Sequence, residues 1–155
     1  MNIKYLQHLK DNPIAYTSDT EIQFKIEGIS ESEIQQLELT WNNGNLFPQV
    51  LKELLFLAGE FCYVCDYGPN DSQQEIQEWI REHMGDNNRS INRPFYAFDV
   101  WGGLNFLFIY LDEGDNPPVF QAQPYSDDDN WIEPLQFQTI QSIIIDRVKI
   151  GQNPY

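Results

Sequence analysis

Long apolar runs are missing from this chain of 155 residues. A helix that crosses a bilayer needs about 18 or more consecutive apolar residues, and no stretch of the sequence offers them. The first 20 residues mix lysine, histidine, aspartate and proline with a few apolar positions and contain no apolar run of signal-peptide length. We therefore expect a soluble cytoplasmic protein that does not enter a membrane.

Cysteine is also scarce, with only Cys62 and Cys65. Two cysteines are too few for a disulfide scaffold, which agrees with a reducing compartment. Their spacing is that of half a zinc site or of a redox pair, but a structural zinc site needs about four ligands, and His8 and His83 stand alone. The pair follows a predicted helix and lies in a strand-like run, where positions three apart point to opposite faces. We expect two buried thiols and no metal or cofactor.

Sequence motifs for catalysis are absent. The chain has no nucleophile elbow, no His-Glu-x-x-His pair, no phosphate-binding loop and no Gly-rich dinucleotide fingerprint. Pairs of carboxylates are abundant, but in an acidic chain only geometry separates a catalytic pair from surface charge. The sequence predicts a protein that is not an enzyme, and a carboxylate-based enzyme is the least favoured alternative.

Positive charge is missing from residues 94–146. These 53 residues carry nine Asp or Glu and no Lys or Arg, in a chain whose net charge is -15. The electrostatic field of this negative charge repels nucleic-acid phosphates and anionic lipids, and it speeds the approach of cationic partners. We therefore expect no direct binding of nucleic acid or membrane and predict a basic protein partner.

The residues that are present support one folded domain over residues 1–155. Hydrophobic residues make up 41% of the chain and aromatic residues 14%. A chain of this length buries roughly 70% of its unfolded surface around one core. The charge therefore belongs to an ordinary globular protein and not to a disordered acidic chain.

Apolar spacing in the N-terminal half predicts four helices and two strands. A short helix ends near residues 12–13, and residues 21–27 alternate as a half-buried strand. Ser30 followed by Glu33 begins a second helix, and Pro48 begins a third that ends at Gly59. Residues 61–67 are typical of a strand. After a loop at residues 68–71, a helix carries Ile76, Trp79, Ile80 and His83 or Met84 at helical spacing.

The C-terminal half is predicted to be mostly strands. Residues 95–101 and 104–111 form a hairpin around Gly102-Gly103, and residues 117–122 add a strand that begins with prolines. A loop follows over residues 124–134. The last segment, residues 135–148, places apolar residues on one helical face, namely Phe137, Ile140, Ile144 and Val148.

The order of these segments resembles the SMI1/KNR4 family of the SUKH superfamily. Residues 30–39 and the Leu-Phe-Pro start at 46–48 of the following helix resemble its paired opening helices. Residues 95–111, the turn from Gly114 to Phe120 and a closing helix from about Phe137 are similar to its C-terminal half. The resemblance covers about residues 30–148.

What the resemblance implies is an α+β domain in which helices pack against a central, mostly antiparallel sheet. Members act mainly as immunity proteins that neutralise a toxin. We therefore predict that this chain binds a cognate toxin domain, and its own charge favours a basic one such as a nuclease. The alternative is a regulatory scaffold of the same fold with an endogenous protein partner.

Partner-binding residues are expected on the acidic loops and on aromatic side chains beside them, because loops carried by a rigid scaffold concentrate binding groups. Neither acidic run has the ligand spacing of a calcium loop, so we predict no metal site there. A solvated loop remains the alternative for the acids, and core packing remains the alternative for the tryptophans. The candidates are Asp112, Glu113, Asp115, Asp127, Asp128, Asp129 and Glu133, together with Trp101, Tyr125 and Trp131.

Overall fold

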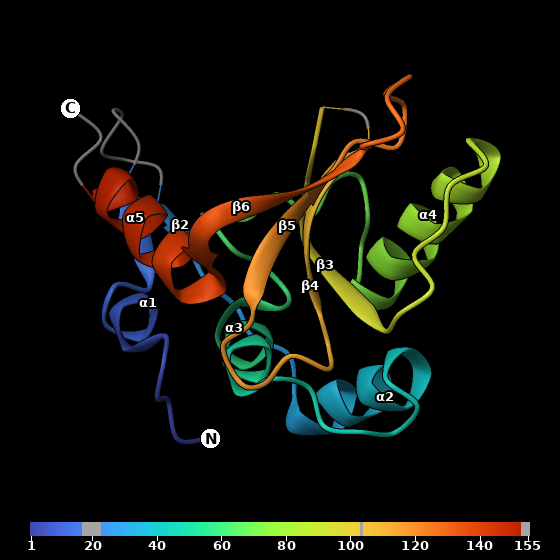
Figure 1. The fold of residues 1–155 in the computed structure, drawn as a ribbon. Helices are drawn as coiled ribbons and strands as arrows, with labels where there is room; N and C mark the ends of the chain where they lie inside the picture. Colours follow the sequence, from blue (N-terminus) through green and yellow to red (C-terminus); the bar gives the residue numbers. More distant parts are fainter. Residues whose placement is uncertain (17–22, 103, 153–155) are drawn as a thin grey trace.

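A four-stranded antiparallel sheet forms the centre of the molecule (Figure 1). The computed structural model describes residues 1–16, 23–102 and 104–152. Each strand pairs with the next along the chain, which is the arrangement that short connections between antiparallel strands favour. The strands are β3 (Phe95–Trp101), β4 (Asn105–Tyr110), β5 (Pro118–Ala122) and β6 (Ile132–Thr139). A separate hairpin joins β1 (Ile14–Tyr16) to β2 (Gln23–Lys25).

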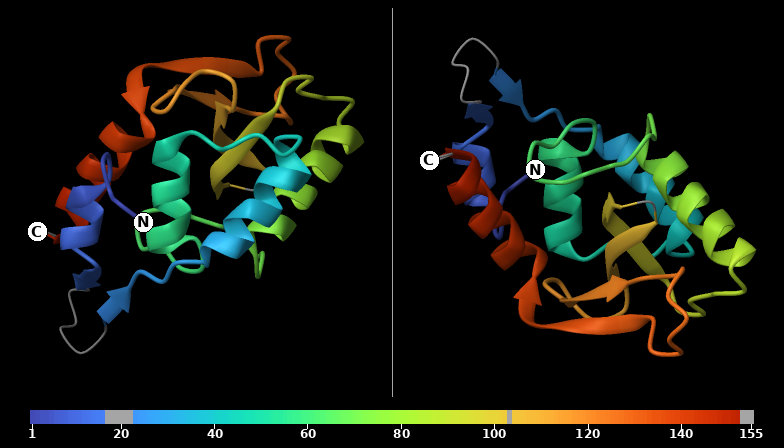
Figure 2. Two further views of the ribbon diagram at one scale, coloured as in Figure 1. Left: turned by 90° about the horizontal axis from the view of Figure 1, so that it is seen from below. Right: turned by 90° about the horizontal axis from the view of Figure 1, so that it is seen from above.

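Helices cover both faces of the sheet (Figure 2). One face packs against α4 (Gln73–Asp86) through an aromatic cluster that includes Phe95, Phe106 and Phe108. The opposite face carries the larger core, to which the other helices contribute. These helices are α1 (Gln7–Asp11), α2 (Glu31–Trp41), α3 (Gln49–Ala58) and α5 (Ile140–Gln152). The described residues therefore form a single α+β domain, as the sequence predicted.

Local signals in the sequence set the helix starts. The Ser30 hydroxyl accepts a hydrogen bond from the Glu33 amide at 3.1 Å, and the Ser72 hydroxyl accepts one from the Glu75 amide at 3.1 Å. Each bond satisfies an amide that has no partner within its own helix. Pro48 precedes α3, where its missing amide proton leaves no donor unpaired. The predicted starts of α2 and α3 are confirmed.

Buried polar side chains fix the outer elements to this core. Glu53 of α3 is fully buried and accepts hydrogen bonds from the backbone amides of residues 4–6 at 2.7 to 3.0 Å, which ties the N-terminus to α3. Gln77 of α4 bonds both the amide and the carbonyl of Ala97, and Arg81 bonds the carbonyl of Phe95. These contacts occupy backbone groups along the outer edge of β3.

Two predicted elements are wrong. Residues 61–67 form bends with isolated bridges at Phe61 and Tyr67 instead of a strand. Residues 132–139 form β6, whereas we expected a loop up to residue 134 and a helix from residue 135. Phe137 consequently lies in the strand and is 98% exposed, while Ile140, Ile144 and Val148 are buried in α5 as predicted.

The bends at 63–65 also change the relation of the two cysteines. Both thiols are free and buried, as predicted, but both belong to the larger core instead of pointing to opposite faces. Hydrogen bonding from the Cys65 side chain lowers the pKa of Cys62. The same bond, with burial, raises the pKa of Cys65.

The predicted strand over residues 21–27 is confirmed in part. β2 covers Gln23–Lys25, and residues 21 and 22 lie outside the described part of the chain. Ile26 is buried, but Phe24 is 42% exposed and stacks on Phe61 with ring centroids 6.2 Å apart.

Every helix in residues 1–16, 23–102 and 104–152 is too short or too polar to cross a bilayer.

Candidate partner-binding site

The ten candidate residues lie at opposite ends of the central sheet. Since successive strands run antiparallel, the turn between β4 and β5 lies at one end, and the β3–β4 and β5–β6 connections lie at the other (Figure 1). The acids of residues 112–115 are therefore far along the strands from those of residues 127–133. The structure does not bring the two acidic groups together.

The acids of the β4–β5 turn contact an arginine of the same chain. Arg93 approaches the Asp112 carboxylate at 2.5 Å and the Glu113 carboxylate at 2.9 Å. Its guanidinium also lies 3.8 Å from the ring centroid of Tyr110. The hydrogen bond from Arg93 lowers the pKa of the Asp112 carboxyl group. These two carboxylates are thus partly neutralised before any partner arrives.

Asp115 in the same turn holds the start of α3. Its carbonyl oxygen accepts a hydrogen bond from the Val50 amide at 3.0 Å, and its carboxylate accepts one from the Gln49 amide at 3.3 Å. An acidic side chain is favourable there because the N-terminus of a helix carries partial positive charge. The turn therefore has a structural role that the sequence did not indicate.

The acids of the β5–β6 loop and of the start of β6 make no such contacts. Asp127, Asp128, Asp129 and Glu133 are exposed, and no ion pair involves them within the part of the chain that the structure describes. Arg89 lies close, but it donates to the backbone carbonyls of residues 126 and 128 at 2.9 and 3.2 Å. Arg89 thus fixes the loop backbone and leaves the carboxylates accessible.

The three aromatic candidates differ in exposure. Tyr125 is 58% exposed in the β5–β6 loop. Trp131 is half-buried against the cluster under α4, with the Arg89 guanidinium 5.5 Å from its ring centroid. Trp101 is half-buried at the end of β3 and borders a pocket. Tyr125 is the candidate whose ring is most available to a partner.

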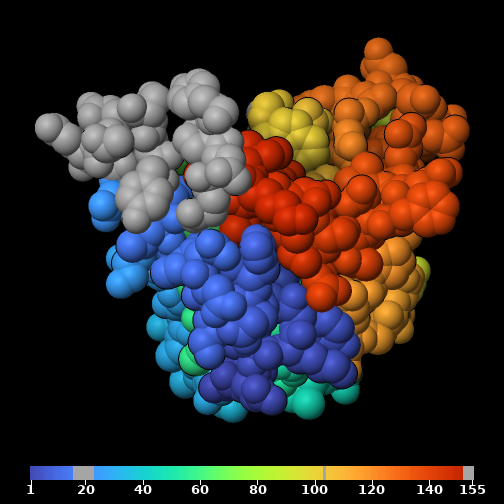
Figure 3. Space-filling model, turned by 90° about the vertical axis from the view of Figure 1, so that its left-hand side faces the viewer, coloured from blue at the N-terminus to red at the C-terminus, as the bar shows by residue number. Residues whose placement is uncertain are grey.

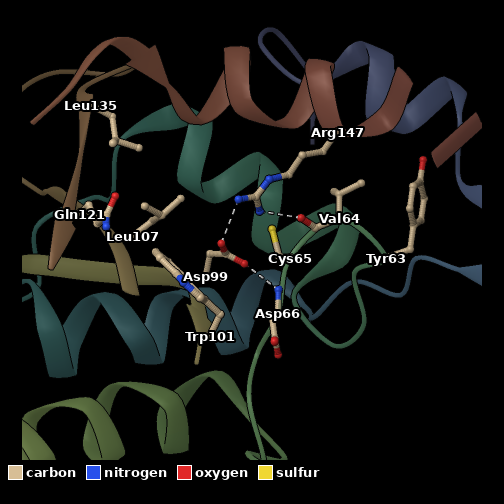
Figure 4. Close-up of a pocket in the computed structure, with 10 residues that line it drawn as sticks. All are labelled: Tyr63, Val64, Cys65, Asp66, Asp99, Trp101, Leu107, Gln121, Leu135 and Arg147. Carbon is tan, nitrogen blue, oxygen red and sulfur yellow. Dashed lines mark hydrogen bonds and ion pairs between the residues drawn. The ribbon is translucent and has the colours of Figure 1, made fainter. Parts of the chain in front are cut away.

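The pocket beside Trp101 has a volume of about 660 Å³ and opens between α5, the 62–67 segment and the sheet (Figure 4). On the side of the molecule shown in Figure 3, the end of β3 (yellow) reaches the surface beside α5 (red) and β6 (orange). The lining combines apolar walls with charged groups. It consists of Tyr63, Val64, Cys65, Asp66, Asp99, Trp101, Leu107, Gln121, Leu135 and Arg147.

A β-bulge directs Asp99 into this pocket. The pairing of β3 with β4 shifts register between Ala97 and Asp99, so Phe98 is the additional residue. Ala97 and Val100 both pack toward α4, while Phe98 belongs to the opposite core. Without the bulge, strict alternation would point Asp99 toward α4.

The Asp99 carboxylate connects three segments. One oxygen accepts a hydrogen bond from the Asp66 amide at 2.7 Å, and the other accepts one from Arg147 of α5 at 3.0 Å. Arg147 also donates to the Val64 carbonyl at 2.8 Å. Partial burial opposes the charge of Arg147, but the hydrogen bond and the negative charge of Asp99 outweigh it, so the pKa of Arg147 is raised.

The β strands extend the pocket toward Glu133. Asp99 pairs with Leu107, Leu107 with Gln121, and Gln121 with Glu133, one residue from each strand. Residues directly opposite each other in an antiparallel pair have side chains on the same face. Glu133 therefore stands on the pocket face, next to Gln121 of the lining. This row links one residue of the β5–β6 acidic group to the pocket.

Sequence reasoning did not assign Arg147 or Gln121 to the site, and it placed Phe137 on the apolar face of a helix. Arg147 and Gln121 join the site through contacts between distant segments, which leave no local pattern. Phe137 has a positive φ of 63° in a bulge where β6 uses five steps, from Pro134 to Thr139, against two steps in β5. Positive φ is strained for an aromatic residue, and no turn sequence with glycine marks the position.

Metal binding has no support from clustered ligands. Among residues 1–16, 23–102 and 104–152, no three His, Cys, Asp or Glu side chains are grouped so that they could hold an ion. The run at residues 127–129 points its carboxylates to solvent as separate groups, and Asp128 accepts a hydrogen bond from the Asn130 amide at 2.9 Å.

Comparisons with known proteins add no assignment. No family model matches the chain, and neither a curated protein nor a solved structure matches it.

Proposed function

We propose that this protein is a non-enzymatic immunity protein that binds and neutralises a basic toxin domain. The observation that carries the proposal is the group of free carboxylates at one end of the sheet, at Asp127, Asp128, Asp129 and Glu133. No internal cation in the described chain neutralises them. A fixed anionic surface of this kind attracts Lys-rich and Arg-rich partners and orients them during encounter.

Two further features support binding through this end of the sheet. The loop backbone is held by Arg89 at two carbonyls, so its charges are presented from a fixed position. The exposed Tyr125 ring lies in the same loop, and tyrosine is among the residues enriched at the energetic centre of protein interfaces. Charge would speed association, and the aromatic ring would slow dissociation.

The toxin part of the proposal rests on the resemblance of residues 30–148 to the SMI1/KNR4 family. A basic toxin domain such as a nuclease carries the opposite charge, because it must approach phosphate groups. An acidic protein that covers such a surface blocks the access of nucleic acid. The partner would thus be neutralised by occlusion, with no chemical step.

Co-expression with the toxin encoded beside the gene of this chain tests the proposal. We expect the chain to protect cells from that toxin and to co-purify with it. We also expect the association rate to fall about five-fold or more between roughly 0.05 and 0.5 M salt, because salt screens exposed charges. Absence of both protection and binding would refute immunity. Capture of an endogenous basic protein instead would favour the regulatory scaffold.

A further inference from the structure

We propose that the pocket beside Trp101 receives an arginine side chain of the basic partner. The inference rests on the proposed function only in the identity of that partner, because the pocket itself can be tested with small probes. It assigns a specific contact to a surface that the acidic loop does not include. The argument concerns charge, hydrogen-bonding capacity and shape.

The charges of the pocket favour a cation. Asp66 and Asp99 line it against the single guanidinium of Arg147. Arg147 already donates to the Asp99 carboxylate and to the Val64 carbonyl. Glu133 adds an exposed carboxylate on the same face, across from Gln121. An anionic ligand would meet an excess of negative charge, whereas a cation would reduce that excess.

Acceptors with free capacity lie around the pocket. Each oxygen of Asp99 accepts one hydrogen bond, and a carboxylate oxygen can accept two. The Asp66 carboxylate uses one oxygen to bind the Gly68 amide. Gln121 is half-buried, and its side-chain amide has no hydrogen-bond partner among the residues that the structure describes. A guanidinium offers five donors, which matches several acceptors better than the compact ammonium of lysine does.

The walls suit the remainder of an arginine side chain. Leu107 and Leu135 provide apolar surface for its methylene groups, and Trp101 provides an indole on which a flat cation can stack (Figure 4). Arginine is also more weakly hydrated than lysine, so it loses less on entering a half-enclosed site. The combination of indole, apolar walls and carboxylates selects arginine.

A titration followed by NMR tests the pocket on the full chain. The probe is N-acetyl-arginine-N-methylamide, and its neutral isostere N-acetyl-citrulline-N-methylamide is the control. We expect the Trp101 indole signal and the backbone signals of Gln121 and Leu135 to shift with the arginine probe. The citrulline probe should bind more weakly by a factor of about five or more, because it has the same shape without the charge.

Two variants sharpen the assignment. Gln121→Leu should weaken arginine binding by about three-fold because it removes an acceptor from the pocket. Asp66→Asn should weaken it by about the same factor because it removes a negative charge beside the pocket. Gln136→Leu, an exposed glutamine of β6 outside the lining, should leave binding unchanged. Thermal unfolding of each variant checks that the fold is retained.

Three results would overturn the assignment of this pocket to arginine. The first is no signal shift at about 50 mM probe, a concentration well above the millimolar dissociation constant expected for one side chain. The others are equal shifts with the citrulline probe and shifts confined to residues 124–131. None of them bears on protection from a toxin, which tests the proposed function separately. Arginine binding without any toxin partner would support the pocket and direct the search to another basic protein.

Discussion

The two acidic turns of the sheet have similar sequences and opposite environments. In the β4–β5 turn, Asp112 and Glu113 pair with Arg93, and Asp115 binds the start of α3. In the β5–β6 loop, residues 127–129 face solvent, and the nearby Arg89 donates its hydrogen bonds to backbone carbonyls instead of to these carboxylates. The difference arises from where one arginine is placed and which oxygen atoms it contacts. Local charge in the sequence does not show which carboxylates remain available to a partner.

The same principle applies to the whole acidic segment. Residues 94–146 contain no Lys or Arg, but Arg89, Arg93 and Arg147 lie just outside its ends in sequence. In the fold all three contact it, at the β5–β6 loop, at the β4–β5 turn and at Asp99. The segment therefore contains no cationic residue of its own, but cationic side chains from outside it contact it in the fold. Function is therefore expected where these arginines leave carboxylates unpaired.

The largest effect should come from the most buried of the paired carboxylates. Asp99→Ala removes the partner of Arg147 and of the Asp66 amide, and Asp99 is only 4% exposed. Breaking a fully buried pair costs 3–5 kcal/mol, and since Arg147 is partly exposed we expect a loss of about 2–3 kcal/mol in the free energy of unfolding. Urea unfolding followed by tryptophan fluorescence measures it.

The exposed pair in the β4–β5 turn gives the matched control. Asp112→Ala should lower the free energy of unfolding much less than Asp99→Ala does, because solvent screens an exposed ion pair. A double variant, Asp99→Leu with Arg147→Met, should be more stable than Asp99→Ala, since it leaves no unpaired charge. Equal losses for Asp99→Ala and Asp112→Ala would show that burial does not distinguish the two pairs.

The next effect concerns binding and compares the two turns directly. Replacing Asp127, Asp128 and Asp129 with asparagine should slow association with the proposed basic partner by about ten-fold at low salt, because it removes the free charges. The free energy of unfolding should change by about 0.5 kcal/mol or less, since these side chains make few contacts. Stopped-flow association and urea unfolding give the two quantities.

A second triple variant makes the same change in net charge at the other end of the sheet. It combines Asp112→Asn, Glu113→Gln and Asp115→Asn, and we expect it to slow association by about two-fold or less, because these carboxylates are already paired. If both triple variants slow association equally, net charge and not its position controls encounter. That result would contradict the assignment of the binding surface to the β5–β6 loop.

Local chemistry made much of the fold predictable from the sequence. The Ser30 and Glu33 pattern, Pro48 before α3 and the hairpin around Gly102 each act within a few residues, and the structure confirms each element. β6 was not predictable in the same way. Its run of Leu, Gln, Phe and Gln fits a strand or a helix, and only pairing with β5 decides between them.

The candidate site was predictable in composition and not in arrangement. The acidic loop and its aromatic residue could be proposed from sequence alone. The bulge at Phe98, which turns Asp99 toward Arg147, and the approach of α5 to the 62–67 segment depend on contacts between distant residues. No local pattern encodes such contacts, so the pocket was found only in the structure.

The smallest effect tests whether Arg93 controls the β4–β5 turn. The hydrogen bond from Arg93 lowers the pKa of Asp112 below its ordinary value of 3.8. A carboxyl group whose folded pKa is depressed adds stability above its unfolded pKa and loses that contribution as pH falls through the folded value. The contribution of Asp112 should therefore be present above about pH 4 and disappear below it.

Carboxyl-carbon NMR of Asp112 measures this directly in the native protein and in Arg93→Met. The titration midpoint should lie lower in the native protein and return toward the ordinary value in the variant, because the charged donor is gone. Arg93→Met should also make the β4–β5 turn more like the β5–β6 loop, with two carboxylates newly available to cations. An unchanged midpoint would mean that Arg93 does not pair with the Asp112 carboxylate in solution. The contrast between the two acidic turns would then disappear.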